Sequence, residues 1–211
     1  MQTTKPANIS FRASVNEHLK IGSNDRFALF IDGANFYSTM QMLGVEVDFE
    51  RLLAYFSRPH RPLRAYYYTD IPRADVSHNM HNLVRYLDYN GYQTVTKTMR
   101  TFTDEYTGEQ RHKGNMDIEL AVDCLELRDY LDTFILFSGD GDFVPLVHAL
   151  QRHGKTVGIV SSERTRPPIL SSELHRCADF FIELEAIASD IQREERPVPP
   201  GTQSQTQSEP V

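Results

Sequence analysis

Apolar and polar positions along the chain follow two alternating patterns. Short runs of apolar and β-forming residues are separated by longer segments whose apolar residues recur every three or four positions, as on one face of a helix. The expected strands lie at residues 26–32, 62–71, 92–98, 133–137, 155–162 and 179–184. Because these strands alternate with helical segments, we expect an α/β sandwich around a mostly parallel sheet.

Turn and capping residues indicate where several helices begin and end. The helix that follows strand 26–32 is expected to end at Gly44, and Asp48 is a candidate N-cap for a second helix over residues 49–56. By contrast, the polar segment 98–115 has two glycines and no steady period. We expect it to be a loop or a loose hairpin.

Length and composition are those of one globular domain. The chain has 211 residues, of which 40% are hydrophobic and 24% charged, enough to bury a sizeable core. We expect an N-terminal extension over residues 1–25 and a single domain over residues 26–195. The tail, residues 196–211, is rich in Pro, Gln, Ser and Thr and is expected to be disordered.

The chain lacks the patterns of a secreted, membrane or zinc protein. No apolar run approaches the length that spans a bilayer, and the polar N-terminus has no signal-peptide core, so we expect a cytoplasmic protein with no membrane partner. Its two cysteines, Cys124 and Cys177, lie far apart and form no zinc motif. The net charge of −7 argues against a protein that coats nucleic acid, yet it suits a site that collects divalent cations.

Acidic residues follow the expected strands at positions that bind ligands in α/β folds. Asp32 ends the first strand, Asp140 and Asp142 follow the fourth, and Asp117 begins the helix that leads into that fourth strand. The carboxyl ends of parallel strands meet at one edge of the sheet, where a crevice opens if the winding direction reverses between neighbouring strands. We therefore expect these carboxylates to converge, provided that the first and fourth strands are neighbours.

Converging carboxylates repel one another unless a cation lies among them. Mg²⁺ and Mn²⁺ prefer oxygen ligands and leave room for a phosphate oxygen, so the pattern favours metal-dependent phosphodiester hydrolysis. Asn35 lies one helical turn after Asp32, and Ser138 begins the glycine turn. Both are candidates for binding a water or a phosphate.

Other interpretations of the same aspartates remain open. Asp32, Asp140 and Asp142 precede helices and are common N-cap and turn residues, and Asp117 suits a first helical turn. Asp123 lies on the same helix as Asp117 but points about a third of a turn away from it around the helix axis, so it is a secondary candidate for metal binding. The stretch DGDFV also fits the D-x-D-x-V pattern of aspartyl phosphatases, although that motif usually follows the first strand. A metal- or RNA-binding regulator without catalytic activity is the alternative from another functional class.

Three ordered motifs resemble the NYN domain family, the LabA-like branch of the PIN-like nucleases: FIDGANFY, HKGNMDIELAVD and LFSGDGDFVPLVHALQRHGKTVGIV. The resemblance covers residues 26–187 and implies a PIN-like, Rossmann-like three-layer α/β/α sandwich. Asn115 and Met116 stand where the family pattern has a single apolar residue.

The resemblance also implies a function. It implies a ribonuclease that cuts RNA internally with Mg²⁺ or Mn²⁺, whose catalytic and metal-binding residues here are Asp32, Asn35, Asp117, Asp140 and Asp142. The expected RNA contacts come from Ser138, Lys97, Arg100, Arg111 and Lys113, with Arg164 and Arg166 as further candidates. The segment between the third and fourth strands is a candidate homodimer contact.

Overall fold

The computed structural model describes residues 20–58, 60–71, 78–98, 100–103, 110–113 and 115–194. The predicted disordered tail and all but the last six residues of the predicted N-terminal extension lie outside this range.

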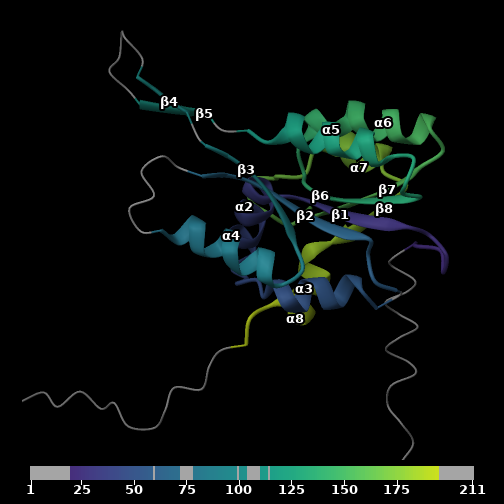
Figure 1. Ribbon diagram of the computed structural model, residues 1–211, viewed down its shortest axis with the longest axis horizontal. Coiled ribbons are helices and arrows are strands. Elements are labelled where there is room, and N and C mark those ends of the chain that lie inside the picture. Colours follow the sequence, from purple (N-terminus) through teal and green to yellow (C-terminus); the bar gives the residue numbers. More distant parts are fainter. Residues whose placement is uncertain are drawn as a thin grey trace, which may run out of the picture.

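A six-stranded sheet whose paired strands are all parallel forms the centre of the described structure, in the order β3-β2-β1-β6-β7-β8 (Figure 1). The bounds of these strands are β1 (Phe27–Asp32), β2 (Arg64–Ile71), β3 (Gln93–Thr98), β6 (Thr133–Phe137), β7 (Thr156–Ser161) and β8 (Phe180–Glu183). Each coincides with an expected strand to within two residues at either end, and the parallel α/β class is confirmed.

Helices cover both faces of the sheet, which gives the expected three layers (Figure 1). The first apolar cluster packs one face under α2 (Gly33–Leu43), α3 (Phe49–Phe56), α4 (Asn79–Tyr89) and α8 (Leu184–Ile191). The second cluster packs the other face under α5 (Asp117–Leu127), α6 (Val144–Arg152) and α7 (Ser172–Cys177).

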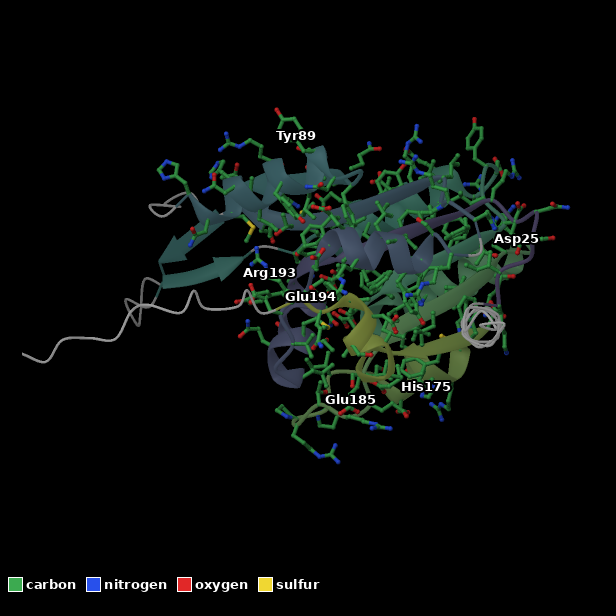
Figure 2. The ribbon with its side chains drawn as sticks, turned by 90° about the horizontal axis from the view of Figure 1, so that it is seen from below. Asp25, Tyr89, His175, Glu185, Arg193 and Glu194 are labelled. Carbon is green, nitrogen blue, oxygen red and sulfur yellow. The ribbon has the colours of Figure 1, made fainter. Side chains whose placement is uncertain are left out.

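The two covered faces explain why the strands are continuous apolar runs rather than alternating ones. In β1, Phe27, Leu29 and Ile31 point into one cluster, while Ala28 and Phe30 point into the other. In β2, Tyr66, Tyr67 and Tyr68 are all at most 8% exposed, because that strand is also covered on both faces. Tyr89 on α4, by contrast, is 83% exposed and projects from the surface (Figure 2).

The predicted helix ends are confirmed where capping residues marked them. Gly44 adopts the left-handed conformation, with φ of 68°, and its amide bonds back to carbonyls of the last turn of α2. Asp48 accepts a hydrogen bond of 3.0 Å from the backbone amide of Arg51 at the start of α3. The segment 98–115 contains the antiparallel hairpin of β4 (Arg100–Thr103) and β5 (Gln110–Lys113). It is therefore a hairpin, the second of the two forms expected.

The chain reverses its winding direction between β1 and β6, which pair directly, Ile31 opposite Phe137. From β1 the chain first winds outward to β2 and β3, then crosses to the other side of the sheet through α5 and continues to β7 and β8. This arrangement is the topological switch point at which open α/β sheets bind ligands. Within the described residues, no helix has the length and apolar character needed to cross a membrane.

Candidate metal centre

A pocket of about 400 Å³ opens at the carboxyl edge of the sheet, at the switch point between β1 and β6. Its walls come from the end of β2, the first turns of α2 and α5, the turn after β6 and the loop before α7. Six of the residues that line it are aspartates or asparagines: Asp32, Asn35, Asp70, Asn115, Asp117 and Asp140. The pocket is therefore rich in oxygen ligands.

Asp32 is the most buried of these acids, with 8% of its surface exposed. Its carboxylate accepts hydrogen bonds from the backbone amide of Asn35, at 3.2 Å, and from the hydroxyl of Ser138, at 3.1 Å. Burial raises the pKa of Asp32 to about 6. The two hydrogen bonds lower it, and the charges of Asp117 and Asp140 raise it further. Without a cation, ionising Asp32 therefore costs more free energy than ionising an exposed aspartate.

The turn after β6 places Asp140 near this carboxylate and Asp142 near Asp140 and Asp117. The side chain of Asn35 accepts a hydrogen bond of 2.9 Å from the amide of Gly139 and so links the turn to α2. Asp140 in turn accepts a bond of 2.9 Å from the amide of Asp142. A side chain at Gly139 would lie 2.9 Å from backbone atoms of the loop before α7, which explains why the turn needs glycine there.

Asp117 enters the site from the first turn of α5. The side chain of Asn115 makes two hydrogen bonds to this residue. Its Nδ2 donates to the Asp117 carboxylate at 2.6 Å, and its Oδ1 accepts from the Asp117 backbone amide at 2.7 Å. Partial burial raises the pKa of Asp117, the Asn115 bond lowers it, and the charges of Asp140 and Asp142 raise it. These two bonds to Asn115 thus fix the position of the Asp117 carboxylate at the start of α5.

Three of the four predicted acids converge tightly, and the fourth adjoins them. Asp117, Asp140 and Asp142 each place one carboxylate oxygen within 4.8 Å of the other two. Asp32 lies outside this group, although it lines the same pocket as Asp117 and Asp140 and feels their charges. The donors are all carboxylate oxygens, which fits a hard divalent cation such as Mg²⁺ or Mn²⁺ and not a soft, sulfur-preferring one.

The capping interpretation is confirmed for Asp32 and Asp140 but not for Asp142, and it does not compete with metal binding. Asp32 caps α2, and Asp140 caps the short 3₁₀ turn Gly141–Phe143 that leads into α6. A single capping bond leaves Asp140 its second oxygen, and Asp142 accepts no hydrogen bond from the described residues. The same bonds therefore hold the carboxylates of Asp32 and Asp140, two of the acids that line the pocket.

Several residues predicted to contact RNA are held elsewhere or fall outside the described side chains. Ser138 is 1% exposed and bonds within the protein, donating to Asp32 and accepting from the amide of Asp140. Lys97 forms an ion pair of 2.7 Å with Glu119. The side chains of Arg100, Arg111 and Lys113 lie outside the described part of the structure. Asp123, the secondary metal candidate, instead accepts a hydrogen bond of 2.9 Å from Tyr68.

Sequence reasoning missed two residues of the pocket, Asp70 and Asn115. Asp70 lies near the end of β2 and lines the pocket, and one of its carboxylate oxygens is buried without a hydrogen-bond partner among the described residues. Burial raises the pKa of Asp70, Lys97 lowers it and Glu119 raises it. Asp70 could have been found because it is an acid near the end of a long apolar strand. Asn115 could have been found because the chain has one residue more than the family pattern before Asp117.

Comparisons with known proteins identify the family and the fold. Residues 26–185 match the model of the NYN domain. The low amplitude and bright protein LabA of Synechococcus elongatus is 33% identical over 177 residues, which cover 82% of this chain and 91% of LabA. An uncharacterized protein of Methanocaldococcus jannaschii is 33% identical over 73 residues, or 34% of this chain and 29% of that protein. The crystal structure of a Vibrio parahaemolyticus protein of unknown function has the same fold, with a TM-score of 0.61 and 23% identity, over 80% of this chain and 96% of that one.

Proposed function

The chain belongs to the NYN domain family of PIN-like nuclease domains, and on that premise we propose that it is a ribonuclease that cuts RNA internally and depends on Mg²⁺ or Mn²⁺. The observation that carries the proposal is the convergence of carboxylates from β1, α5 and the turn after β6 in one open pocket. Within the described structure, no lysine or arginine side chain bonds to any of Asp32, Asp117, Asp140 or Asp142. A bound cation would balance this charge.

Asp117 and Asp140 would hold the cation directly, Asp32 from the inner wall of the pocket, and Asp142 directly or through a water. When bound, a divalent cation activates a water and stabilises the negative charge that develops on the attacked phosphate and the leaving oxygen. The chain supplies the orientation of the ligands. Ser138 and the Asn35 amide fix the carboxylate of Asp32, and the Asn115 amide fixes that of Asp117.

Asn35 ties the two halves of the site together. Its carbonyl oxygen holds the Gly139 amide at 2.9 Å, which keeps the acidic turn against the first turn of α2. The residue lines the pocket, and its side-chain nitrogen forms no hydrogen bond within the described structure. That nitrogen is the group that would donate to a phosphate oxygen of the RNA.

Arg166 is the arginine that best fits a contact to the RNA backbone among those described. It is exposed on the loop before α7, and this loop bonds to the acidic turn through the Ser171 amide and the Gly139 carbonyl oxygen at 2.8 Å. The neighbouring Arg164 already pairs with Glu185 at 2.6 Å, whereas the side-chain bond of Arg166 goes to the carbonyl oxygen of Thr165. Arg166 can therefore bind a phosphate without breaking an ion pair.

Cleavage of a circular single-stranded RNA with Mn²⁺ or Mg²⁺ tests the proposal, because a circle has no ends for an exonuclease. The parent protein is expected to open the circle. The Asp140→Asn, Asp142→Asn double variant is expected to lose at least about 100-fold in rate. Asp129→Asn, at an exposed position whose side chain is 76% accessible, is the matched control and should cut at the parent rate.

Equal rates for the parent and the double variant would refute the assignment of the site. Calorimetric measurement of Mn²⁺ binding distinguishes the nuclease from the alternative, a regulator without catalytic activity. Binding that the double variant loses, in a preparation that leaves RNA uncut, would identify a regulator with the same fold and not a nuclease. Crystals soaked in Mn²⁺ should show density between Asp32, Asp117 and Asp140.

A further inference from the structure

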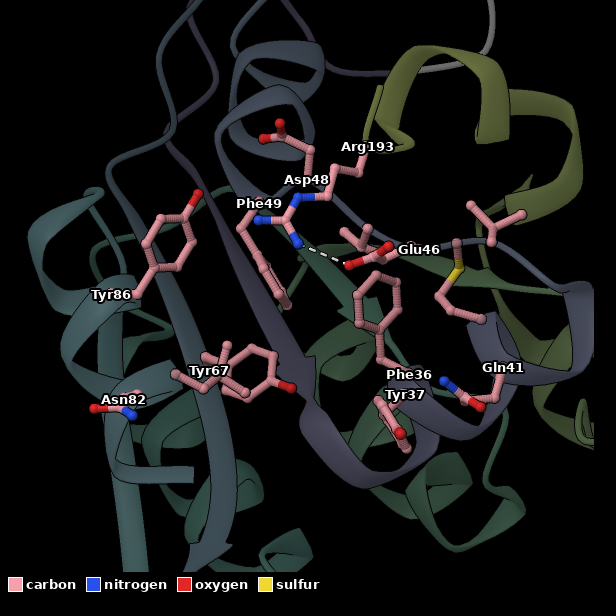
Figure 3. A pocket seen from close by; sticks show the side chains of 14 residues that line it. Phe36, Tyr37, Gln41, Glu46, Asp48, Phe49, Tyr67, Asn82, Tyr86 and Arg193 are labelled. Carbon is pink, nitrogen blue, oxygen red and sulfur yellow. Dashed lines mark hydrogen bonds and ion pairs between the residues drawn. The ribbon is translucent and has the colours of Figure 1, made fainter. Parts of the chain in front are cut away.

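A second pocket, of about 530 Å³ (Figure 3), lies on the other side of α2 from the acidic pocket, as the residues that line each pocket show. The acidic pocket is lined by Ala34, Asn35, Ser38 and Met42, and the second pocket by Phe36, Tyr37, Met40 and Gln41. At 100° per residue these two sets occupy roughly opposite faces of the helix. The other walls of the second pocket come from β2, α4, the segment before α3 and Arg193.

Five of the fourteen residues that line this second pocket are aromatic. Phe36 and Tyr67 are 2% and 3% exposed, and Phe49 packs edge-on against Tyr67 with ring centroids 5.6 Å apart. Tyr37 and Tyr86 also line the pocket and are 62% and 39% exposed, so they lie where an entering ligand would meet them. Figure 3 shows rings of this set surrounding the pocket. The volume is within the range of pockets that bind small organic ligands.

Polar groups at defined points of the wall remain available to a ligand. Tyr67 is 97% buried as a residue, but its hydroxyl oxygen is not among the buried side-chain atoms that lack a partner, and it has no hydrogen-bond partner within the described structure. Because Tyr67 lines the pocket, this hydroxyl is available to a ligand or a water there. The amide of Gln41 also has no side-chain partner in the described part, and Asn82 keeps its amide nitrogen free while its oxygen accepts from Arg85 at 2.9 Å.

We propose that this pocket binds a nucleobase. The wall offers aromatic faces for stacking, together with a hydroxyl and two amides that can bond the polar edge of a planar ring, which is how proteins bind unstacked bases. An aliphatic chain would leave the Tyr67 hydroxyl unpaired, and a sugar would leave the aromatic rings without a flat partner. On one side of the pocket Arg193 pairs with Glu46 at 2.7 Å, so neither charge is left to attract a phosphate (Figure 3).

Tyr67 connects this pocket to the acidic one. A Cβ built on Gly33 would lie 2.7 Å from the Tyr67 ring, so the ring packs directly against the residue that follows Asp32. A base in the second pocket would therefore be separated from the metal centre by α2 and this one ring. The base would come either from the RNA that is cut, in which case the inference rests on the proposed function, or from a free nucleoside or nucleotide.

Titration with the four ribonucleosides and with ribose, in EDTA, tests base binding without any need for cleavage. Saturation-transfer NMR is the main readout; the chain has no tryptophan, so tyrosine emission, to which three of the ten tyrosines contribute from the pocket wall, is the second. We expect at least one nucleoside to bind and ribose to give no signal. The Tyr37→Ala variant should bind roughly 5- to 100-fold more weakly, the loss of one stacking ring. Tyr67→Phe, which removes only a hydroxyl, should weaken binding roughly 2- to 10-fold.

Tyr89→Ala is the matched control, because Tyr89 is exposed on α4 and does not line the second pocket. Its affinity should equal that of the parent. The proposal is overturned if no nucleoside binds, if ribose binds as tightly, or if Tyr37→Ala and Tyr67→Phe both keep the parent affinity. Tyr37 is exposed and Tyr67→Phe keeps the ring, so both variants are expected to fold, with circular dichroism as the check.

RNA cleavage by the same variants distinguishes the two sources of the base. If the base belongs to the substrate, Tyr37→Ala raises the KM for single-stranded RNA by a similar factor, and Tyr89→Ala does not. If the base belongs to a free nucleoside or nucleotide, the nucleoside affinity falls while the KM stays unchanged. A protein that cuts no RNA would refute the proposed function, and the nucleoside titration would still decide whether the pocket binds a base.

Discussion

Replacing Asp32 by asparagine is expected to stabilise the metal-free protein and, at the same time, to abolish RNA cleavage. The substitution removes a charge that is 92% buried and keeps the shape of the side chain. The carbonyl oxygen of the new amide can still accept from the Asn35 backbone amide, and its nitrogen can donate to the hydroxyl of Ser138. What the variant loses is the negative charge that a cation needs.

The size of the stabilisation follows from the pKa of Asp32. Burial and the neighbouring acids raise this pKa from 3.8 to about 6, a shift of about two units. Each unit corresponds to about 1.36 kcal/mol, so the ionised carboxylate costs the folded protein about 3 kcal/mol at pH 7. The asparagine variant avoids this cost. Its free energy of unfolding in EDTA at pH 7 should exceed that of the parent by about 2–3 kcal/mol.

The sign of the pH dependence provides a second check. A raised pKa means that the folded parent binds more protons than the unfolded chain between about pH 4 and pH 6, so the stability of the parent falls as the pH rises through this window. Below about pH 4, Asp32 is protonated in both the folded and the unfolded parent, so the higher stability of the variant should vanish. Above about pH 6, Asp32 is ionised in both states of the parent, so the difference in stability between variant and parent should be constant.

Urea denaturation in EDTA at pH 4, 5 and 7.5, followed by circular dichroism, measures the difference in unfolding free energy. Asp129→Asn, at an exposed position, is the control and should follow the parent at each pH. Mn²⁺ at 100 times its Kd should stabilise the parent by about 2.7 kcal/mol and the Asp32→Asn variant by much less. A variant that is less stable than the parent at pH 7.5, or whose advantage is the same at pH 4, would refute the reasoning.

Three further substitutions test other contacts of the site. Ser138→Ala removes the donor to Asp32 and the acceptor for a backbone amide, and should cost about 1–3 kcal/mol in urea denaturation. Gly139→Ala places a methyl group 2.9 Å from the backbone of the loop before α7, which should cost about 1–3 kcal/mol and lower cleavage in the same preparation. Arg166→Ala should lower the slope of log Kd against log salt for single-stranded RNA by about 0.7. Lys97→Ala, whose lysine is already paired with Glu119, should leave that slope unchanged and is the matched control.

The elements of the fold were predictable because the physical cause of each is local. A strand covered on both faces is an uninterrupted apolar run, and β1 and β6 are such runs in the sequence. Gly44 and Asp48 end and begin helices through bonds to residues at most four positions away. The family was recognisable for a related reason, since each of its three motifs is a continuous stretch.

Local sequence patterns do not encode the order of the strands in the sheet. The predictions that missed residues or contacts of the site did so for this reason. Asp70 lies near the end of β2, but it belongs to the pocket only because β2 pairs with β1. The same non-local pairing helps to bury all three tyrosines of β2, each of which is at most 8% exposed. The ion pair of Lys97 with Glu119 joins residues 22 positions apart, and nothing near Lys97 in the sequence indicates it.

The four predicted acids illustrate how capping and metal binding can depend on the same bonds. Capping requires only one oxygen of a carboxylate, and in Asp140 and Asp117 the hydrogen bond goes to one oxygen and leaves the other available. Such a bond fixes the direction of the carboxylate and partly offsets the rise in pKa that burial causes, as it does at Asp32 and Asp117. An acid held in this way near the carboxyl edge of a parallel sheet is therefore aimed more precisely than a free one, and its pKa rises less than burial alone would raise it. It follows that removing such a bond, as in Asn115→Ala, should weaken Mn²⁺ binding even though no ligand is changed.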